Sequence, residues 1–261
     1  MKKYQFSLFL SVLFLFSSII FFSCKSGSNK AETTEGAEKE EMTQKENTDE
    51  EWMILFDGSG TEGWRNYKEE TFPEEGWAIE DGALKCIGSG KGEAGGKGGD
   101  IIYDKKFKDF HLKLEWKISE GGNSGIFYLA QEIEGKPIWN SAPEMQILDN
   151  ERHIDANLGV DGNRKAGSLY DLIPADPQNA KPAGEWNQAE IMVYQGTVIH
   201  KMNGEVVLEY HLGTPEWEEM IANSKFEGMP FGEYKPGYIG LQDHGNDVWF
   251  RDIMIKDLTV N

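Results

Sequence analysis

The sequence contains little cysteine, little positive charge and almost no helical periodicity. Its two cysteines, Cys24 and Cys86, rule out a disulfide-based scaffold, so the fold must be stabilised by its core. The chain carries 26 basic against 45 acidic residues, for a formal net charge of −19. Nucleic acids and anionic membrane surfaces are therefore excluded as partners, because both would be repelled. This charge fits a neutral or cationic ligand.

Two common kinds of site are also missing. The glycine-rich segment Gly88 to Gly99 is not a phosphate loop, because Lys91 occupies the first glycine position and Gly98 the Ser/Thr position. We interpret it as a surface loop. No two histidines have the spacing of a catalytic zinc site on one element. His153 with Asp155 is the best metal-binding candidate, but we assign neither a metal nor a cofactor, and a divalent metal requirement stays open.

The first residues have the pattern of an export signal. Met1-Lys2-Lys3 precedes an apolar stretch from Phe6 to Phe22, which ends in Ser23-Cys24. This end resembles the lipobox of bacterial lipoproteins, although Phe21 replaces the usual Leu. We expect Cys24 to carry lipid, with an uncleaved membrane anchor as the alternative. The predicted location is the bacterial cell envelope, periplasmic or cell-surface, with the lipid anchor as the only membrane attachment.

Composition divides the chain into three parts. Residues 1–24 form the signal peptide that ends in the lipidated cysteine. Residues 25–50 contain four Lys against eight acidic residues and no aromatic, which predicts a disordered acidic tether. Residues 51–261 form one domain large enough to bury a core, with no internal repeat. All eight Trp lie in this domain, and they provide large buried areas or platforms for sugar rings.

The domain is predicted to be all-β. Phe110 to Ile118 alternates apolar with polar residues over nine positions, as expected of a strand with one buried face. Trp77 to Ile87 and Ile191 to Tyr210 contain turn dipeptides, of which Asn203-Gly204 is the strongest hairpin signal. Val248 to Val260 predicts a closing strand with a bulge near Arg251-Asp252. A short helix is expected only after Thr214-Pro215. Successive hairpins predict a two-sheet antiparallel β-sandwich with long loops.

Polar residues that suggest chemistry are concentrated between Gly121 and Trp186. In the segment Pro143 to Asp149, alternation places Glu144 and Gln146 on one face, with Met145 and Ile147 in the core. We expect Glu144 to be an exposed carboxylate on the floor of a cleft. Asp149 ends the strand and is expected to reach the same side. This spacing resembles the three acids of β-sandwich endoglucanases, although Gln146 replaces the middle acid.

Three further groups are candidates for the site. His244 follows Asp243 in a turn, where an imidazole beside a carboxylate suits a base near neutral pH. Asn123 and Asn187 are expected in amide-bearing turns that bind sugar hydroxyls. A purely structural role in turns is the alternative for all three.

The ordered motifs resemble one known family. They are Leu55-Phe56-Asp57-Gly58, Gly63-Trp64, Asp109-Phe110, Glu115-Trp116, Asn123-Ser124-Gly125, Glu144 to Asp149, Gly167-Ser168-Leu169-Tyr170, Gly184-Glu185-Trp186-Asn187, Asn203-Gly204, Gly240 to Gly245 and Phe250-Arg251-Asp252-Ile253. Together they cover residues 51–261 and are similar to the 3-keto-disaccharide hydrolase family. Asp252 departs from the Asn often found there. The resemblance implies a concanavalin A-like jelly roll and cleavage of glycosides whose glucose unit is oxidised at C3.

A ketone at C3 acidifies the proton on C2, so a base can remove it and the resulting enolate can expel the group on C1. Such a site needs a base, donors for the enolate oxygen and an acid for the departing oxygen. We expect Glu144 or His244 to be the base, and Asp149 to orient His244 or to act as the acid. The residues expected to bind the substrate or the oxyanion are Asn123, Gln146, Tyr170, Asn187, Gln242 and Arg251.

Two alternatives to this function stay open. One is a retaining endo-glucanase that uses Glu144 and Asp149 directly, which activity on an unoxidised glucan would reveal. The other is a non-catalytic glycan-binding lipoprotein, because fold alone does not establish catalysis. The sequence also leaves open whether water adds after elimination, which separates a hydrolase from a lyase.

Overall fold

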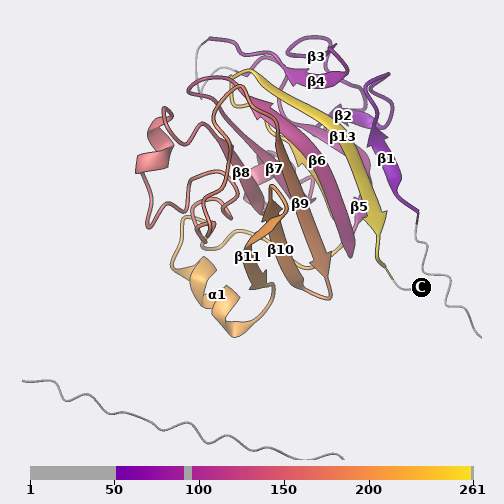
Figure 1. Ribbon diagram of the computed structural model, residues 1–261. Coiled ribbons are helices and arrows are strands. Elements are labelled where there is room, and N and C mark those ends of the chain that lie inside the picture. Colours follow the sequence, from indigo (N-terminus) through magenta and orange to yellow (C-terminus); the bar gives the residue numbers. More distant parts are fainter. Residues whose placement is uncertain (1–50, 91–95, 260–261) are drawn as a thin grey trace, which may run out of the picture. The chain divides into compact units, whose positions relative to one another are not determined.

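The computed structural model describes residues 51–90 and 96–259 (Figure 1). The predicted signal peptide, the predicted lipidation of Cys24 and the predicted tether over 25–50 lie outside these residues. The described domain consists of two antiparallel sheets with long connections, so the predicted β-sandwich is confirmed.

The larger sheet has eight strands and the smaller has five. Within the described residues, the larger sheet has the order β11 (Glu205–His211), β10 (Thr197–Met202), β9 (Asn187–Tyr194), β6 (Phe110–Ile118), β13 (Val248–Asp257), β4 (Ala83–Cys86) and β3 (Trp77–Glu80), with β1 (Met53–Phe56) also paired to β13. The smaller has the order β2 (Trp64–Asn66), β5 (Ile101–Phe107), β12 (Gly237–Leu241), β7 (Asn123–Ala130) and β8 (Glu144–Leu148). The helices are α1 (Pro215–Ala222) and the short 3-10 helices η2 (Ile138–Asn140) and η3 (Ile154–Asn157).

The predicted strands, the Asn203-Gly204 hairpin turn and the predicted bulge occur where the sequence pattern placed them. β6 alternates buried and half-buried residues along its whole length and lies near the middle of the larger sheet. The hairpin turn between β10 and β11 has positive φ angles of 52° at Asn203 and 86° at Gly204, as a type I′ turn requires. The register between β13 and β6 shifts between Arg251 and Met254, with φ of 50° at Asp252, so the predicted bulge is confirmed.

The expectation that Asn123 and Asn187 lie in turns was wrong. Asn123 begins β7, where it pairs with Leu148 of β8, and Asn187 begins β9, where it pairs with Trp116. Both side chains are buried. Cross-strand pairing therefore outweighs the local turn preference of asparagine at both positions.

Each sheet contributes one face to the main core, and the smaller sheet also has a covered outer face. Met145 and Ile147 of β8 pack in the main core between the sheets. A separate apolar cluster of Ile102, Phe127, Ala130, Ile138 and Ala142 joins the outer side of β5 and β7 to the segment around η2. This cluster positions the η2 segment over the smaller sheet.

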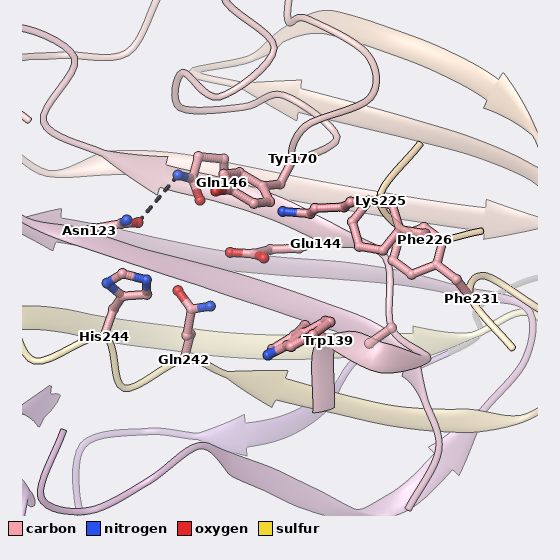
Figure 2. Close-up of a pocket in the computed structure, with 11 residues that line it drawn as sticks. Asn123, Trp139, Glu144, Gln146, Tyr170, Lys225, Phe226, Phe231, Gln242 and His244 are labelled. Atoms are coloured by element: carbon pink, nitrogen blue, oxygen red, sulfur yellow. Dashed lines mark hydrogen bonds between the residues drawn. The ribbon is translucent and has the colours of Figure 1, made fainter. Parts of the chain in front are cut away.

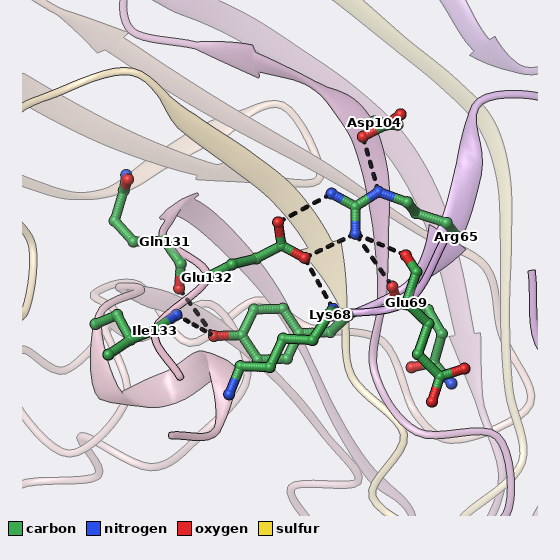
Figure 3. Close-up of polar contacts among 9 residues, drawn as sticks. Arg65, Lys68, Glu69, Asp104, Gln131, Glu132 and Ile133 are labelled. Atoms are coloured by element: carbon green, nitrogen blue, oxygen red, sulfur yellow. Dashed lines mark hydrogen bonds and ion pairs between the residues drawn. The ribbon is translucent and has the colours of Figure 1, made fainter. Parts of the chain in front are cut away.

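A polar network at the edge of the smaller sheet fixes the loop that leads to η2 (Figure 3). The Arg65 guanidinium donates to Glu132 through two nitrogens, at 2.7 and 3.1 Å, and to Asp104 at 2.7 Å. The Lys68 backbone N–H donates to the same Glu132 carboxylate at 2.8 Å. These bidentate contacts raise the pKa of Arg65 and hold β2 against the loop that follows β7.

Candidate active site

A pocket of about 200 Å³ lies over the outer face of the smaller sheet (Figure 2). β7, β8 and the turn after β12 provide its floor, while the η2 segment, the loop near residue 170 and the loop after α1 provide its walls. Its lining residues are Asn123, Trp139, Ala142, Glu144, Gln146, Tyr170, Lys225, Phe226, Phe231, Gln242 and His244. Polar groups lie at one end of the pocket, and three aromatic rings lie at the other.

β8 places Glu144 and Gln146 in the pocket, as alternation along the strand predicted. The expectation that Glu144 is exposed was wrong, because its exposed fraction is only 7%. The loop near residue 170 runs along the free edge of β8: Tyr170 N–H donates to the Glu144 carbonyl at 3.0 Å, and Gln146 N–H donates to the Ser168 carbonyl at 3.0 Å. This added chain segment covers the strand and excludes water from Glu144.

Burial changes the acidity of Glu144. The pKa of this carboxyl is raised to about 8, chiefly by burial; the positive charge of Lys225 opposes this rise, and the negative charges of Asp100 and Asp155 add to it. A carboxyl of this kind is a stronger base than an ordinary glutamate. A pKa near the working pH is also what general acid–base catalysis requires.

A glycine of the neighbouring strand β7, which pairs with Gln146, provides the space for the Glu144 carboxyl group. A Cβ atom added to Gly125 of β7 would lie 2.0 Å from Oε1 of Glu144. Any side chain at this position would displace the carboxylate. The Asn123-Ser124-Gly125 motif is therefore explained by one pocket-lining amide and one position that must stay without a side chain.

A neutral amide, that of Gln146, stands beside Glu144 on the same face of β8. Gln146 is 1% exposed, and its amide nitrogen lies 3.3 Å from Oδ1 of Asn123 (Figure 2). With the amide turned over, this nitrogen donates to the Ser124 carbonyl at 3.0 Å and to Glu144 Oε1 at 3.2 Å. The latter orientation gives Glu144 a hydrogen-bond donor.

The turn after β12 brings Gln242 and His244 into the pocket. Asp243, between them, accepts hydrogen bonds from the backbone N–H groups of Gly98 at 2.9 Å, Gly99 at 3.1 Å and Gly245 at 3.0 Å. Asp243 therefore fixes the turn, and its two neighbours point into the pocket.

Asp149 does not line the pocket. Its carboxylate accepts hydrogen bonds from the backbone N–H groups of Gly121 at 2.7 Å, Glu151 at 3.1 Å and Arg152 at 3.3 Å, and its side chain is 1% exposed. These bonds hold the chain where β8 ends, since backbone donors left without partners there would be costly. The structure thus gives Asp149 a role in the turn.

Asn187 and Arg251 also lie outside the pocket, because both belong to the larger sheet. Oδ1 of Asn187 accepts from the Lys181 N–H at 2.7 Å. Arg251 donates to Glu115 at 2.7 Å and lies 4.0 Å above the ring of Trp186. The four other predicted substrate-binding residues, Asn123, Gln146, Tyr170 and Gln242, line the pocket together with Glu144 and His244.

Sequence reasoning missed the walls of the pocket. Trp139 lies in the short helix η2, and Lys225, Phe226 and Phe231 lie in the loop after α1; neither segment has a periodicity or a recognisable motif. The one usable signal was the aromatic content of the domain. Trp139 is an example, because this large side chain keeps 41% of its surface exposed. Large exposed aromatics beside a pocket are typical of binding sites.

The described residues are 51–90 and 96–259. They contain no group of three or more His, Cys, Asp or Glu side chains placed to hold a metal ion. In the same residues, no helix is long and apolar enough to cross a membrane.

Comparison with known proteins identifies the family. Residues 51–256 match the model of a family described as the 3-keto-alpha-glucoside-1,2-lyase-like domain. The chain belongs to this family. A 3-keto-disaccharide hydrolase from Bacteroides thetaiotaomicron is 54% identical to the chain, over 79% of the chain and 78% of that protein. Membership in the 3-keto-alpha-glucoside-1,2-lyase-like family confirms the predicted family and the predicted class of glycoside-cleaving enzymes.

Solved structures of similar proteins agree with this family. A proposed glycosyl hydrolase from Parabacteroides distasonis is 28% identical and superimposes with a TM-score of 0.69, covering 80% of this chain and 94% of that one. A second from the same species is 27% identical, with a TM-score of 0.58, and covers 80% of this chain and 100% of that one. The sandwich is thus shared with these relatives.

Proposed function

We propose that this protein cleaves the glycosidic bond of 3-keto-disaccharides by removing the C2 proton and then expelling the group on C1. One observation carries the proposal: a single buried carboxyl group, Glu144, shares a small pocket with the imidazole of His244. The relative from Bacteroides thetaiotaomicron, a 3-keto-disaccharide hydrolase, supports the choice of substrate.

Glu144 is the base in this proposal. Its raised pKa makes it better suited to remove a proton from carbon than an ordinary glutamate, and its burial keeps competing water away. His244 donates a proton to the departing oxygen. Gln146, Asn123 and Gln242 provide amide groups for the sugar hydroxyls along the floor of the pocket.

The size of the pocket also fits this reaction. Sites for larger ligands occupy about 300–1,000 Å³, so a pocket of about 200 Å³ suits a short ligand and not a long glycan. The oxidised glucose unit would fill the polar end. The second half of the disaccharide would then lie toward Trp139, Phe226 and Phe231, whose rings suit the apolar face of a sugar.

The rival retaining endo-glucanase requires two carboxyl groups about 5 Å apart across the scissile bond. Asp149, the expected second acid, is bound to three backbone N–H groups outside the pocket. Gln146 is neutral. The arrangement therefore favours a reaction that uses one carboxyl group.

The test compares a 3-keto-disaccharide with its unoxidised parent sugar, with and without chelator. Purified protein should release both halves of the 3-keto substrate and leave the parent intact. A conjugated enone product would indicate elimination without water addition, whereas 3-ketoglucose would indicate net hydrolysis. His244→Gln should slow cleavage most for poor leaving groups, since its role is to protonate the departing oxygen. Binding without turnover would favour the glycan-binding alternative.

A further inference from the structure

Lys225 provides the pocket with an ammonium group that no sequence motif indicated. It follows α1, and among the described residues that line the pocket it is the one Lys or Arg. Its Nζ lies 3.2 Å from Oδ2 of Asp171 and 4.2 Å from the ring centroid of Tyr170. In Figure 2 its amino group points into the polar end of the pocket, above Glu144.

The surroundings of Lys225 hold it in this position. Asp171, its ion-pair partner, also accepts a hydrogen bond from Arg164 Nε at 2.6 Å. Tyr170, whose ring lies under the ammonium, donates its hydroxyl hydrogen bond to Asp155 at 3.1 Å. Arg164 contacts Asp155 as well, at 3.2 Å, which closes the network. An ammonium held by fixed partners needs little reorganisation when charge develops near it.

The position of Lys225 relative to Glu144 matches the geometry of an enolate. In a 3-keto sugar, the proton removed from C2 and the oxygen on C3 belong to adjacent carbons, so the base and the group that stabilises the oxyanion must be neighbours. Lys225 is close enough for its charge to lower the pKa of Glu144 against the effect of burial. A negative charge on the substrate beside Glu144 would experience the same field.

We propose that Lys225 donates a hydrogen bond to the C3 carbonyl oxygen and stabilises the enolate that Glu144 generates. This inference rests on the proposed function. Glu144 takes the C2 proton, the electrons of the C–H bond form a C2–C3 double bond, and the carbonyl electrons move to the oxygen beside Lys225. When the carbonyl re-forms, a C1–C2 double bond forms, the C1–O bond breaks, and His244 supplies the proton to the departing oxygen. An unoxidised C3 hydroxyl gains no such charge, so Lys225 also favours oxidised substrates.

Proton exchange at C2 isolates the step in which Lys225 acts. The probe is 1,5-anhydro-3-ketoglucitol, which has no aglycone to expel at C1; it is incubated in D₂O with the full protein and followed by NMR. The wild type should exchange the C2 proton for deuterium. Lys225→Met should slow both exchange and cleavage of a 3-keto-disaccharide by roughly 100- to 1,000-fold, as is typical of losing an oxyanion donor. Lys225→Arg keeps the charge and should lose less.

The matched control is Lys235→Met, because Lys235 is about as exposed and is also ion-paired but lies outside the pocket. It should exchange at the wild-type rate. Affinity for the parent disaccharide should stay within a few-fold in Lys225→Met, since the effect is on kcat and not on ground-state binding.

If Lys225→Met exchanges the C2 proton at the wild-type rate, the proposed role of Lys225 is overturned. Cleavage of the 3-keto-disaccharide by the wild type would still support the proposed function in that case. Equal losses in the Met and Arg variants would overturn the charge-based account. A wild type that neither exchanges nor cleaves would overturn the proposed function itself.

Discussion

Replacing Glu144 by Gln should make the protein more stable at alkaline pH, because the carboxyl group titrates while buried. The folded state raises the pKa of Glu144 from 4.5 to about 8, so it binds the proton more tightly than the unfolded chain does. The resulting stability is fully present below pH 4.5 and is lost as the pH rises toward 8. Each pH unit in this window costs about 1.4 kcal/mol, which gives an upper limit of roughly 5 kcal/mol.

Gln resembles the protonated carboxyl group in shape and does not titrate. The Glu144→Gln variant and the wild type should therefore melt at similar temperatures near pH 4.5, and the variant should melt higher at pH 8.5. For a domain of this size, about 2–4 °C corresponds to each kcal/mol, so the difference should be several degrees or more. Asp100, whose pKa burial raises to about 7, titrates in the same window. The two proteins must therefore be compared at each pH.

Activity provides the second half of this test. Turnover of a 3-keto-disaccharide should rise with pH toward about 8 in the wild type, because the base must be ionised, and should fall by roughly 100-fold or more in Glu144→Gln. Melting followed by circular dichroism and initial rates across pH 4.5–9 measure both effects. A melting difference that does not change with pH would refute the account of Glu144 as a buried titrating group. Activity that decreases toward pH 8 would instead make Glu144 the acid.

Three further predictions concern other positions. Gly125→Ala should lower turnover at saturating substrate at least tenfold, because the added Cβ would displace the Glu144 carboxylate. An unchanged rate would contradict the close approach of Gly125 to this carboxylate. Asp149→Asn should lower the free energy of unfolding by about 1–3 kcal/mol in urea titrations, because one amide oxygen replaces a carboxylate that accepts three N–H bonds. Turnover should change little. Loss of turnover without loss of stability would instead indicate a catalytic role for Asp149. Cys24→Ser should release the protein from membranes, and variant protein that stays with the membrane after a carbonate wash would indicate an uncleaved anchor.

The sequence predicted the sheets better than it predicted the pocket, because strands have a periodicity and pocket walls do not. Alternation correctly placed β6 and the two faces of β8, and the Asn203-Gly204 dipeptide placed its hairpin. The exposure of Glu144 was mispredicted since it depends on a loop about 25 residues further along the chain, which pairs with β8. Local pattern contains no information about such a contact.

Whether a candidate residue reaches the pocket depends on where the fold places it. Arg251 and Asn187 belong to motifs of the family but lie on the larger sheet, where they bind protein groups. Lys225 lies between recognisable elements and was missed. A motif shows that a residue matters, whereas only the topology shows whether it matters to the fold or to the pocket.

Among the described residues that line the pocket, Glu144 is the one carboxyl group. This restricts which glycosidic bonds the protein can break. Cleavage through an oxocarbenium ion needs a second carboxylate to act as nucleophile or to activate water, whereas Asp149 lies outside the pocket and Gln146, the neighbour of Glu144 on this face of β8, is neutral. A substrate with a ketone at C3 removes this need, because the carbonyl oxygen takes up the negative charge that the reaction generates. One buried base, one donor to the oxyanion and one proton source are then sufficient. Changing Gln146 to Glu would place a second negative charge beside Glu144 and oppose ionisation of both groups, so such a change should reduce activity on 3-keto substrates without creating a glucanase.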